Sequence, residues 1–158
     1  MSDTKLIIGG QVPDFRLPAS GGGEVALSDF RGRKLVIYFY PKNMTPACTQ
    51  EACDFRDRSG ALQALGAVVL GISTDPVKSH DRFREKQSLP FPLLSDEDHK
   101  VCESFGVWQL KKLYGREYEG IVRSTFLIDE EGRLVKEWRG IRVKGHADEV
   151  VAAVKSIN

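Results

Sequence analysis

Long apolar runs mark the strands of this chain. Residues 35–40 and 67–73 are almost continuously apolar and rich in β-favouring side chains, as in strands buried on both faces. Residues 93–95 form a short strand after a proline-rich segment, and residues 124–128 and 134–138 form two more around an acidic turn. These runs predict a central β-sheet.

Helices are expected between and after these strands. One should span about residues 47–65, directly after the first long strand. A second should span residues 75–87, because it opens with an Asp-Pro pair, in which Asp is a favoured N-cap and proline suits the first helical position. A brief helix over residues 99–105 and a final one over about residues 147–156 complete the pattern.

The N-terminal part differs from the rest. Residues 11–17 and 24–27 are predicted as strands around a glycine-rich turn, followed by a short helical turn or loop. The whole order predicts an α/β fold with a central mixed sheet, helices on both faces and an N-terminal β extension. It fits a thioredoxin-like layout, and the absence of a linker or repeat indicates one domain over residues 1–158.

Composition narrows the classes of function. The chain has 158 residues, 41% of them hydrophobic, and a formal net charge of +1, which gives no case for nucleic acid or an anionic membrane surface. The opening residues run into an apolar stretch at residues 6–8 that is too short for a signal-peptide core, and no apolar run approaches the ~20 residues of a membrane span. We therefore expect a cytoplasmic protein, in which cysteines tend to be catalytic or redox-active.

Two cysteines close in sequence carry the candidate chemistry. Cys48 and Cys53 follow the strand 35–40 and a loop that begins with Pro41, so Cys48 lies at the expected helix start. A helix N-terminus offers unpaired N–H groups and a positive dipole end, and both favour a thiolate, the nucleophile of sulfur chemistry. The pattern predicts a reactive cysteine with a second thiol nearby.

The residues around the first cysteine resemble a known family. Pro41 and Thr45-x-x-Cys48 are similar to the peroxiredoxin Pro-x-x-x-Thr-x-x-Cys motif, and Arg123 matches the arginine that the family carries on a strand. The Cys-x4-Cys spacing resembles the subgroup called bacterioferritin comigratory protein or peroxiredoxin Q, as do Glu51 and the segment 106–108.

This resemblance implies a thiol peroxidase that reduces hydrogen peroxide and organic hydroperoxides. It implies that Cys48 is the peroxidatic nucleophile and that Cys53 is the resolving thiol. Thr45 would hydrogen-bond the peroxide and the thiolate, Arg123 would stabilise the thiolate and polarise the oxygens, and Pro41 would shield the pocket. Thioredoxin or glutaredoxin would be the reductant, and neither a metal nor an organic cofactor is implied.

Several of these residues have simpler interpretations. Cys102 sits at an apolar position of a short predicted helix and is interpreted as a core residue. Cys53 is open to the same interpretation, and Arg123 to that of a surface strand arginine. Thr45 is a candidate helix cap. Glu51 is interpreted as a solvated helix carboxylate rather than as a partner of Arg123.

Two rival functions share parts of this pattern. A thioredoxin-like disulfide reductase would need Cys-x-x-Cys, whereas Cys48 and Cys53 have four residues between them. A redox sensor or holdase would use both cysteines without needing Thr45 and Arg123. Zinc binding is not indicated, because no Cys and His pattern has metal-site spacing. We expect a monomer, with a dimer left open.

The spacing of the cysteines has a mechanical consequence. Residues five apart on an α-helix lie about 140° apart around its axis, with Cα atoms ~8.6 Å apart. A disulfide without backbone movement needs a Cα separation of at most ~7 Å. If Cys48 and Cys53 both lie on one regular helix, oxidation must therefore unwind part of it.

Overall fold

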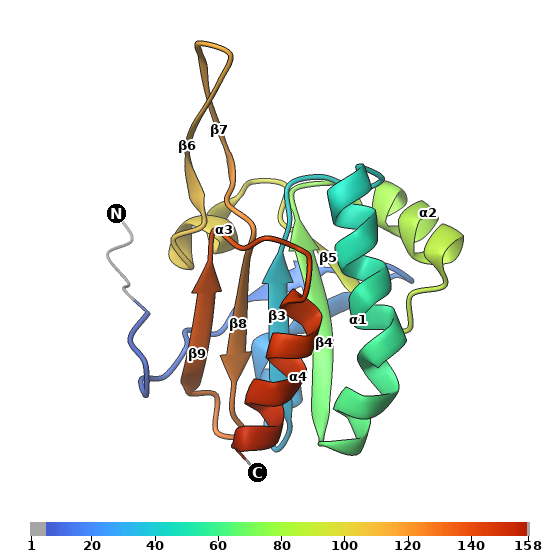
Figure 1. Cartoon of the computed structure of the whole chain (residues 1–158), viewed down its shortest axis with the longest axis vertical. Helices are drawn as coiled ribbons and strands as arrows, with labels where there is room; N and C mark the ends of the chain where they lie inside the picture. Colours follow the sequence, from blue (N-terminus) through green and yellow to red (C-terminus); the bar gives the residue numbers. More distant parts are fainter. Residues whose placement is uncertain (1–5, 158) are drawn as a thin grey trace.

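A five-stranded mixed sheet forms the centre of the protein, as seen in a computed structural model that describes residues 6–157 (Figure 1). The strand order is β5-β4-β3-β8-β9, in which β3, β4 and β5 run parallel and β8 runs antiparallel to both of its neighbours. The strands are β3 (Lys34–Phe39), β4 (Ala67–Ser73), β5 (Leu93–Ser95), β8 (Ser124–Ile128) and β9 (Leu134–Arg139). The predicted mixed sheet is confirmed.

Helices and the N-terminal extension cover the two faces of this sheet (Figure 1). One face packs against α1 (Pro46–Ala64), α2 (Val77–Gln87) and α4 (His146–Ser156), whose buried side chains share one apolar cluster with the sheet. The other face packs against α3 (Lys100–Ser104), the 3-10 turn η1 (Leu27–Phe30) and the two-stranded sheet of β1 (Arg16–Pro18) and β2 (Glu24–Ala26). The predicted α/β class, with helices on both faces, is confirmed.

The pairing of β3 with β8 brings the residues of the candidate site together. Every residue of both strands is buried, in agreement with their mostly apolar sequence. Because the strands are antiparallel and Phe39 pairs with Ser124, the start of β8 lies beside the end of β3. The loop after β3 and the residue before β8, Arg123, are thereby brought to the same edge of the sheet.

Most predicted boundaries agree with the structure to within one residue, but the first strand and the start of α2 differ in kind. The expected strand over residues 11–17 is reduced to β1, and Gln11 contributes only an isolated bridge to Arg133. The N-cap of α2 is Pro76 rather than Asp75. The Asp75 carboxylate instead accepts hydrogen bonds from the backbone N–H of Asn43 and the hydroxyl of Ser73, so tertiary contacts override its capping preference.

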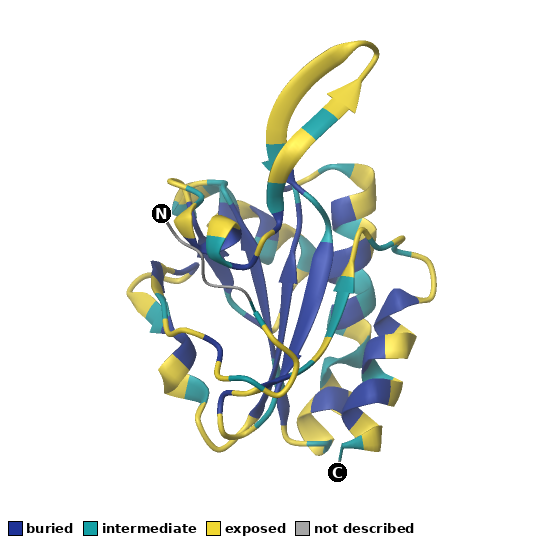
Figure 2. Cartoon of the chain, turned by 90° about the vertical axis from the view of Figure 1, so that its left-hand side faces the viewer, coloured by how far each residue is buried: buried dark blue, intermediate teal, exposed yellow. Residues whose placement is uncertain are grey.

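A protruding hairpin was not predicted. Strands β6 (Trp108–Leu113) and β7 (Arg116–Ile121) form a ribbon of their own that stands clear of the buried sheet (Figure 2). Its turn places Tyr114 and Gly115 at positive φ, as a two-residue hairpin turn requires. Four large side chains of the hairpin are exposed, although the sequence pattern indicated no such surface: Leu110, Leu113, Tyr114 and Tyr118.

None of the helices between residues 6 and 157 is both long and apolar enough to cross a membrane. Residues 1–5, which belong to the opening segment judged unsuitable for a signal peptide, lie outside the described residues.

Candidate active site

Cys48 occupies the first turn of α1. Thr45 is the N-cap residue and its carbonyl accepts the first intrahelical hydrogen bond, from the N–H of Thr49 at 2.9 Å. The Cys48 side chain is 1% exposed and packs among apolar residues of the sheet and helices. The predicted placement at a helix N-terminus is thus observed. It puts the sulfur close to the positive end of the helix dipole.

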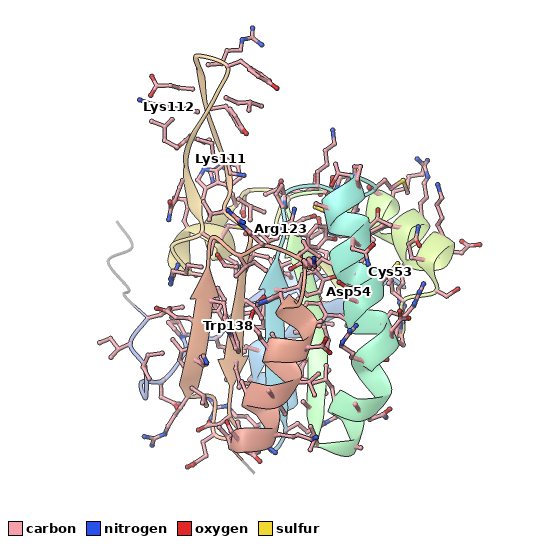
Figure 3. All side chains as sticks on the ribbon, viewed as in Figure 1. Cys53, Asp54, Lys111, Lys112, Arg123 and Trp138 are labelled. Atoms are coloured by element: carbon pink, nitrogen blue, oxygen red, sulfur yellow. The ribbon has the colours of Figure 1, made fainter. Side chains whose placement is uncertain are left out.

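Arg123 reaches this sulfur from the other side of the site. Its Nη2 donates a hydrogen bond to Sγ of Cys48 at 3.4 Å, and its Nη1 donates to Oε1 of Glu51 at 2.7 Å. Figure 3 shows Arg123 near the first turns of α1, above the start of β8. A single guanidinium therefore donates to two acceptors at once, which its planar fork of donors allows.

Glu51 is not the solvated carboxylate that the sequence indicated. Its side chain is buried, one turn after Cys48 on the same face of α1, and it forms an ion pair with Arg123. Burial raises the pKa of Glu51 to about 7, although Arg123 opposes this rise. Its Oε2 is buried and has no hydrogen-bond partner among the described residues.

Glu51 and Cys48 stabilise the positive charge of Arg123. Burial by itself would lower the pKa of the guanidinium, but Glu51 and Cys48 outweigh that effect and the pKa lies above its ordinary value. The site thus holds a permanent positive charge within hydrogen-bonding distance of a buried sulfur.

Thr45 and Pro41 lie in the loop that precedes α1. The Thr45 hydroxyl makes no capping hydrogen bond to the helix and instead donates to the carbonyl of Lys42 at 3.0 Å. Thr45 and Pro41 are both half-buried. The capping role considered for Thr45 is therefore wrong for its side chain, because the hydroxyl turns back into its own loop.

A buried polar network that the sequence did not reveal fixes this loop. The side-chain amide of Asn43 accepts a hydrogen bond from the Tyr40 hydroxyl at 2.6 Å and donates to Ser79 and to Nδ1 of His80, each at 3.0 Å. Nε2 of His80 lies 2.9 Å from the carbonyl of Leu94. Because a carbonyl only accepts, Nε2 carries the proton and Nδ1 accepts from Asn43. Burial lowers the pKa of His80, which favours this neutral form.

The network stabilises an unusual backbone conformation in the loop. Met44, next to Asn43, has a φ of 65°, a left-handed conformation that costs energy for a residue other than glycine. The contacts of Asn43 hold the loop in this conformation and tie it to α2. Sequence spacing gave no signal for the network, since its members are up to about 50 residues apart and neutral histidines have no motif of their own.

Cys53 lies on a different face of α1 from Cys48. Its half-buried thiol donates a hydrogen bond to Oε1 of Gln87, the last residue of α2, at 3.4 Å. In Figure 3 Cys53 is on the α2 side of α1, away from Arg123. Both cysteines belong to one 19-residue helix and are unbonded, so the structure describes the reduced protein.

Cys102 lies in the core, as expected. Its side chain is fully buried on the opposite face of the sheet from Cys48, and its N–H donates to the carboxylate of Asp96 at 2.7 Å. Burial raises the pKa of the Cys102 thiol well above its ordinary value. A thiol kept in its protonated form is a poor nucleophile.

A second cation, Lys111 about halfway along β6, was not predicted from the sequence. Burial, followed by the nearby positive charge of Arg123, lowers the pKa of Lys111, and the charge of Cys48 opposes this effect. Lys111 and Lys112 are labelled on the hairpin in Figure 3. Between residues 6 and 157, no three His, Cys, Asp or Glu side chains gather closely enough to hold a metal ion.

Sequence comparison relates this chain to known proteins. The model of the AhpC/TSA family matches residues 8–137. Peroxiredoxin Bcp of Bacillus subtilis is 52% identical over 151 residues, which cover 96% of each chain.

Solved structures agree with the sequence comparison. A PrxQ mutant of Xylella fastidiosa superposes with a TM-score of 0.91 at 40% identity, covering 96% of this chain and 97% of that one. The bacterioferritin comigratory protein of Xanthomonas campestris, described for its alkyl peroxide reduction activity, superposes with a TM-score of 0.87 at 47% identity and covers 90% and 91%.

Proposed function

The chain belongs to the AhpC/TSA family, in its Bcp or peroxiredoxin Q group, and we propose that this peroxiredoxin reduces peroxides through Cys48 and Cys53. Its fold is thioredoxin-like, and its general activity is that of a peroxidase. One observation carries the assignment of the nucleophile: the Sγ atom of Cys48, in the first turn of α1, accepts a hydrogen bond from Arg123.

In the first step, the Cys48 thiolate attacks one oxygen of the peroxide. An S–O bond forms and the O–O bond breaks, so Cys48 becomes a sulfenic acid and the other oxygen leaves as water or an alcohol after taking up a proton. Negative charge grows on the leaving oxygen. Arg123 and the free N–H groups at the start of α1 are fixed donors that stabilise it.

Two loop residues assist this step. Thr45 directly precedes α1, and its hydroxyl both donates and accepts hydrogen bonds, so it can orient the peroxide beside the sulfur once it releases the carbonyl of Lys42. Pro41 begins the same loop and has no N–H group that would compete for the thiolate or the substrate. We assign it the role of excluding water from the site.

In the second step, Cys53 attacks the sulfur of the Cys48 sulfenic acid. An S–S bond forms, the S–O bond breaks, and hydroxide leaves with the proton of Cys53 as water. An external dithiol then reduces the disulfide by thiol exchange, and thioredoxin or glutaredoxin is the proposed reductant. The alkyl peroxide activity described for the X. campestris relative supports organic hydroperoxides, beside hydrogen peroxide, as substrates.

A peroxide-consumption assay with thioredoxin, thioredoxin reductase and NADPH tests this proposal. The unsubstituted protein should turn over, Cys48→Ser should not, and Cys102→Ser should be nearly unchanged because Cys102 lies outside the site. Cys53→Ser should lose linked turnover but still reduce one equivalent of peroxide, and mass spectrometry should then find one oxygen added at Cys48.

Three results would contradict the proposal. An active Cys48→Ser variant would remove Cys48 as the nucleophile. Normal linked turnover in Cys53→Ser would mean that another thiol resolves the sulfenic acid. Cysteine oxidation without any catalytic turnover would favour the redox sensor over the peroxidase.

A further inference from the structure

We propose that Gln87 restrains Cys53 in the reduced protein and thereby sets how fast the Cys48 sulfenic acid is resolved. Gln87 ends α2, and its side-chain Oε1 accepts the hydrogen bond from the Cys53 thiol. This inference rests on the proposed resolving role of Cys53 and adds a positioning residue on another helix.

A second contact strengthens the restraint. Nη1 of Arg56 donates a hydrogen bond to the backbone carbonyl of Gln87 at 2.8 Å. Cys53 and Arg56 are three residues apart and share one face of α1, so both bind the same residue of α2. The carbonyl is one of those left free at a helix C-terminus, and Arg56 satisfies it.

These two hydrogen bonds are the direct polar link between the helices. Within the described chain, every hydrogen bond found between a residue of α1 and a residue of α2 ends on Gln87. The end of α2 is therefore fastened to the third and fourth turns of α1 at one point. Releasing Gln87 would free Cys53 without disturbing the contact between Cys48 and Arg123.

The direction of the restraint opposes resolution. The contact holds Cys53 towards α2, whereas Cys48 faces Arg123. The Cys53 thiol is the donor in this contact, because the amide oxygen of glutamine only accepts. Attack on the sulfenic acid needs that sulfur to lose its proton and turn away, so this hydrogen bond must break before the disulfide forms.

Slow resolution leaves the Cys48 sulfenic acid open to further oxidation. While Cys48 remains a sulfenic acid, a second peroxide can oxidise it to a sulfinic acid, with one more oxygen transferred to sulfur and the peroxide reduced to water or an alcohol. The strength of the Gln87 contact therefore sets the balance between turnover and irreversible oxidation.

Two substitutions at Gln87 should act in opposite directions. Gln87→Ala removes the acceptor, and disulfide formation should become about threefold to tenfold faster, the range expected from losing one hydrogen bond. Gln87→Glu places a charged, stronger acceptor at the thiol, so disulfide formation should become slower. A merely loosened α2 would move both variants in the same direction. The matched control is Gln63→Ala, at an exposed glutamine near the end of α1.

The measurement mixes reduced protein with one equivalent of hydrogen peroxide, quenches with an alkylating agent and follows the Cys48–Cys53 disulfide by mass spectrometry. The rate of the peroxide step should be unchanged in all variants. The fraction of sulfinic acid at high peroxide should fall in Gln87→Ala and rise in Gln87→Glu.

The outcomes separate this inference from the proposed function. An unchanged or slower disulfide step in Gln87→Ala, or a faster one in Gln87→Glu, would overturn the restraint while leaving Cys53 as the resolving thiol. If the unsubstituted protein formed no Cys48–Cys53 disulfide at all, the resolving role itself would fail, and the restraint with it.

Discussion

At the scale of single residues, the site depends on one guanidinium shared between two partners. Arg123 uses one nitrogen for Cys48 and the other for Glu51, and both partners are buried. A rigid planar fork of donors holds both partners in one fixed geometry, whereas an ammonium is a compact charge on a flexible stem and fixes no such geometry. The identity of this residue should therefore matter more than its charge.

Replacing Arg123 by lysine tests this point. Arg123→Lys keeps the positive charge but loses the fork, so peroxide reduction should slow by about a hundredfold to a thousandfold, as when a fixed donor to a developing oxyanion is removed. Thiolate formation should suffer less, because the helix terminus and the remaining ammonium still favour it. Stopped-flow peroxide kinetics and a pH titration of alkylation separate the two effects. An unchanged peroxide rate would exclude Arg123 from the mechanism.

Glu51 should make stability depend on pH. Its pKa rises from 4.5 to about 7 on folding, so between these values the folded protein holds a proton that the unfolded chain has released. Stability from this group is therefore fully present below about pH 4.5 and is lost as the pH rises to 7. Buried His146 acts oppositely, since burial lowers its pKa to about 4 and its contribution is lost as the pH falls below 6.5.

Glu51→Gln isolates the first effect. Urea unfolding of the reduced protein should give similar stability for variant and parent at pH 4, below the unfolded pKa of 4.5. By pH 8 the variant should have gained on the parent, by at most about 3 kcal/mol for a shift of this size. The exposed carboxylate in Glu131→Gln serves as the control and should show no such trend. A difference between variant and parent that is constant with pH would mean that Glu51 ionises as an ordinary carboxyl.

At the scale of elements, the hydrophobic pattern predicted the strands that are buried in the core. The predicted bounds of β4, β5 and β8 coincide with the observed ones, because these strands are almost entirely buried and their sequence is mostly apolar. The hairpin of β6 and β7 escaped prediction because nearly all of it faces solvent, so no apolar period marks it. Its Tyr114-Gly115 turn was the one available signal.

The parts of the site that depend on local motifs could be predicted from the sequence. The helix start at Cys48 follows from neighbouring residues, and Arg123 entered through a family resemblance. The contacts of Glu51, Asn43 and Gln87 depend on how α1, α2 and the sheet pack together. Local propensity does not encode such packing.

The first half of α1 should change with the redox state. The structure meets the condition set by the spacing, since Cys48 and Cys53 both lie on α1. Their Cα atoms on a regular helix are ~8.6 Å apart, so the disulfide requires unwinding. Hydrogen exchange of the oxidised protein should show lower protection from Cys48 to about Arg56 than the reduced protein does. Equal protection in both states, with the disulfide confirmed by peptide mapping, would rule out unwinding.

At the scale of the whole molecule, packing of the central sheet holds the site together. Cys48 and Arg123 are 75 residues apart and meet only because β8 pairs with β3 in the observed register. The same sheet carries Gly71 in β4, paired with Tyr38 on one side and Leu93 on the other. A side chain at Gly71 would press on both neighbours: its Cβ would lie 2.8 Å from Cδ2 of Leu93 and 2.9 Å from Cζ of Tyr38.

Alanine at two glycines should therefore have opposite effects on stability. Gly71→Ala must displace two buried side chains and should destabilise the protein by about 1–3 kcal/mol, the usual cost of overpacking. Gly60→Ala, on the exposed side of α1 with no atom near its added Cβ, should stabilise it by about 0.5–1 kcal/mol through helix propensity. Urea unfolding of the reduced proteins gives both values. If Gly71→Ala were as stable as its parent, Tyr38 and Leu93 would have to move freely, and the central sheet would not be the close-packed support of the site that its burial indicates.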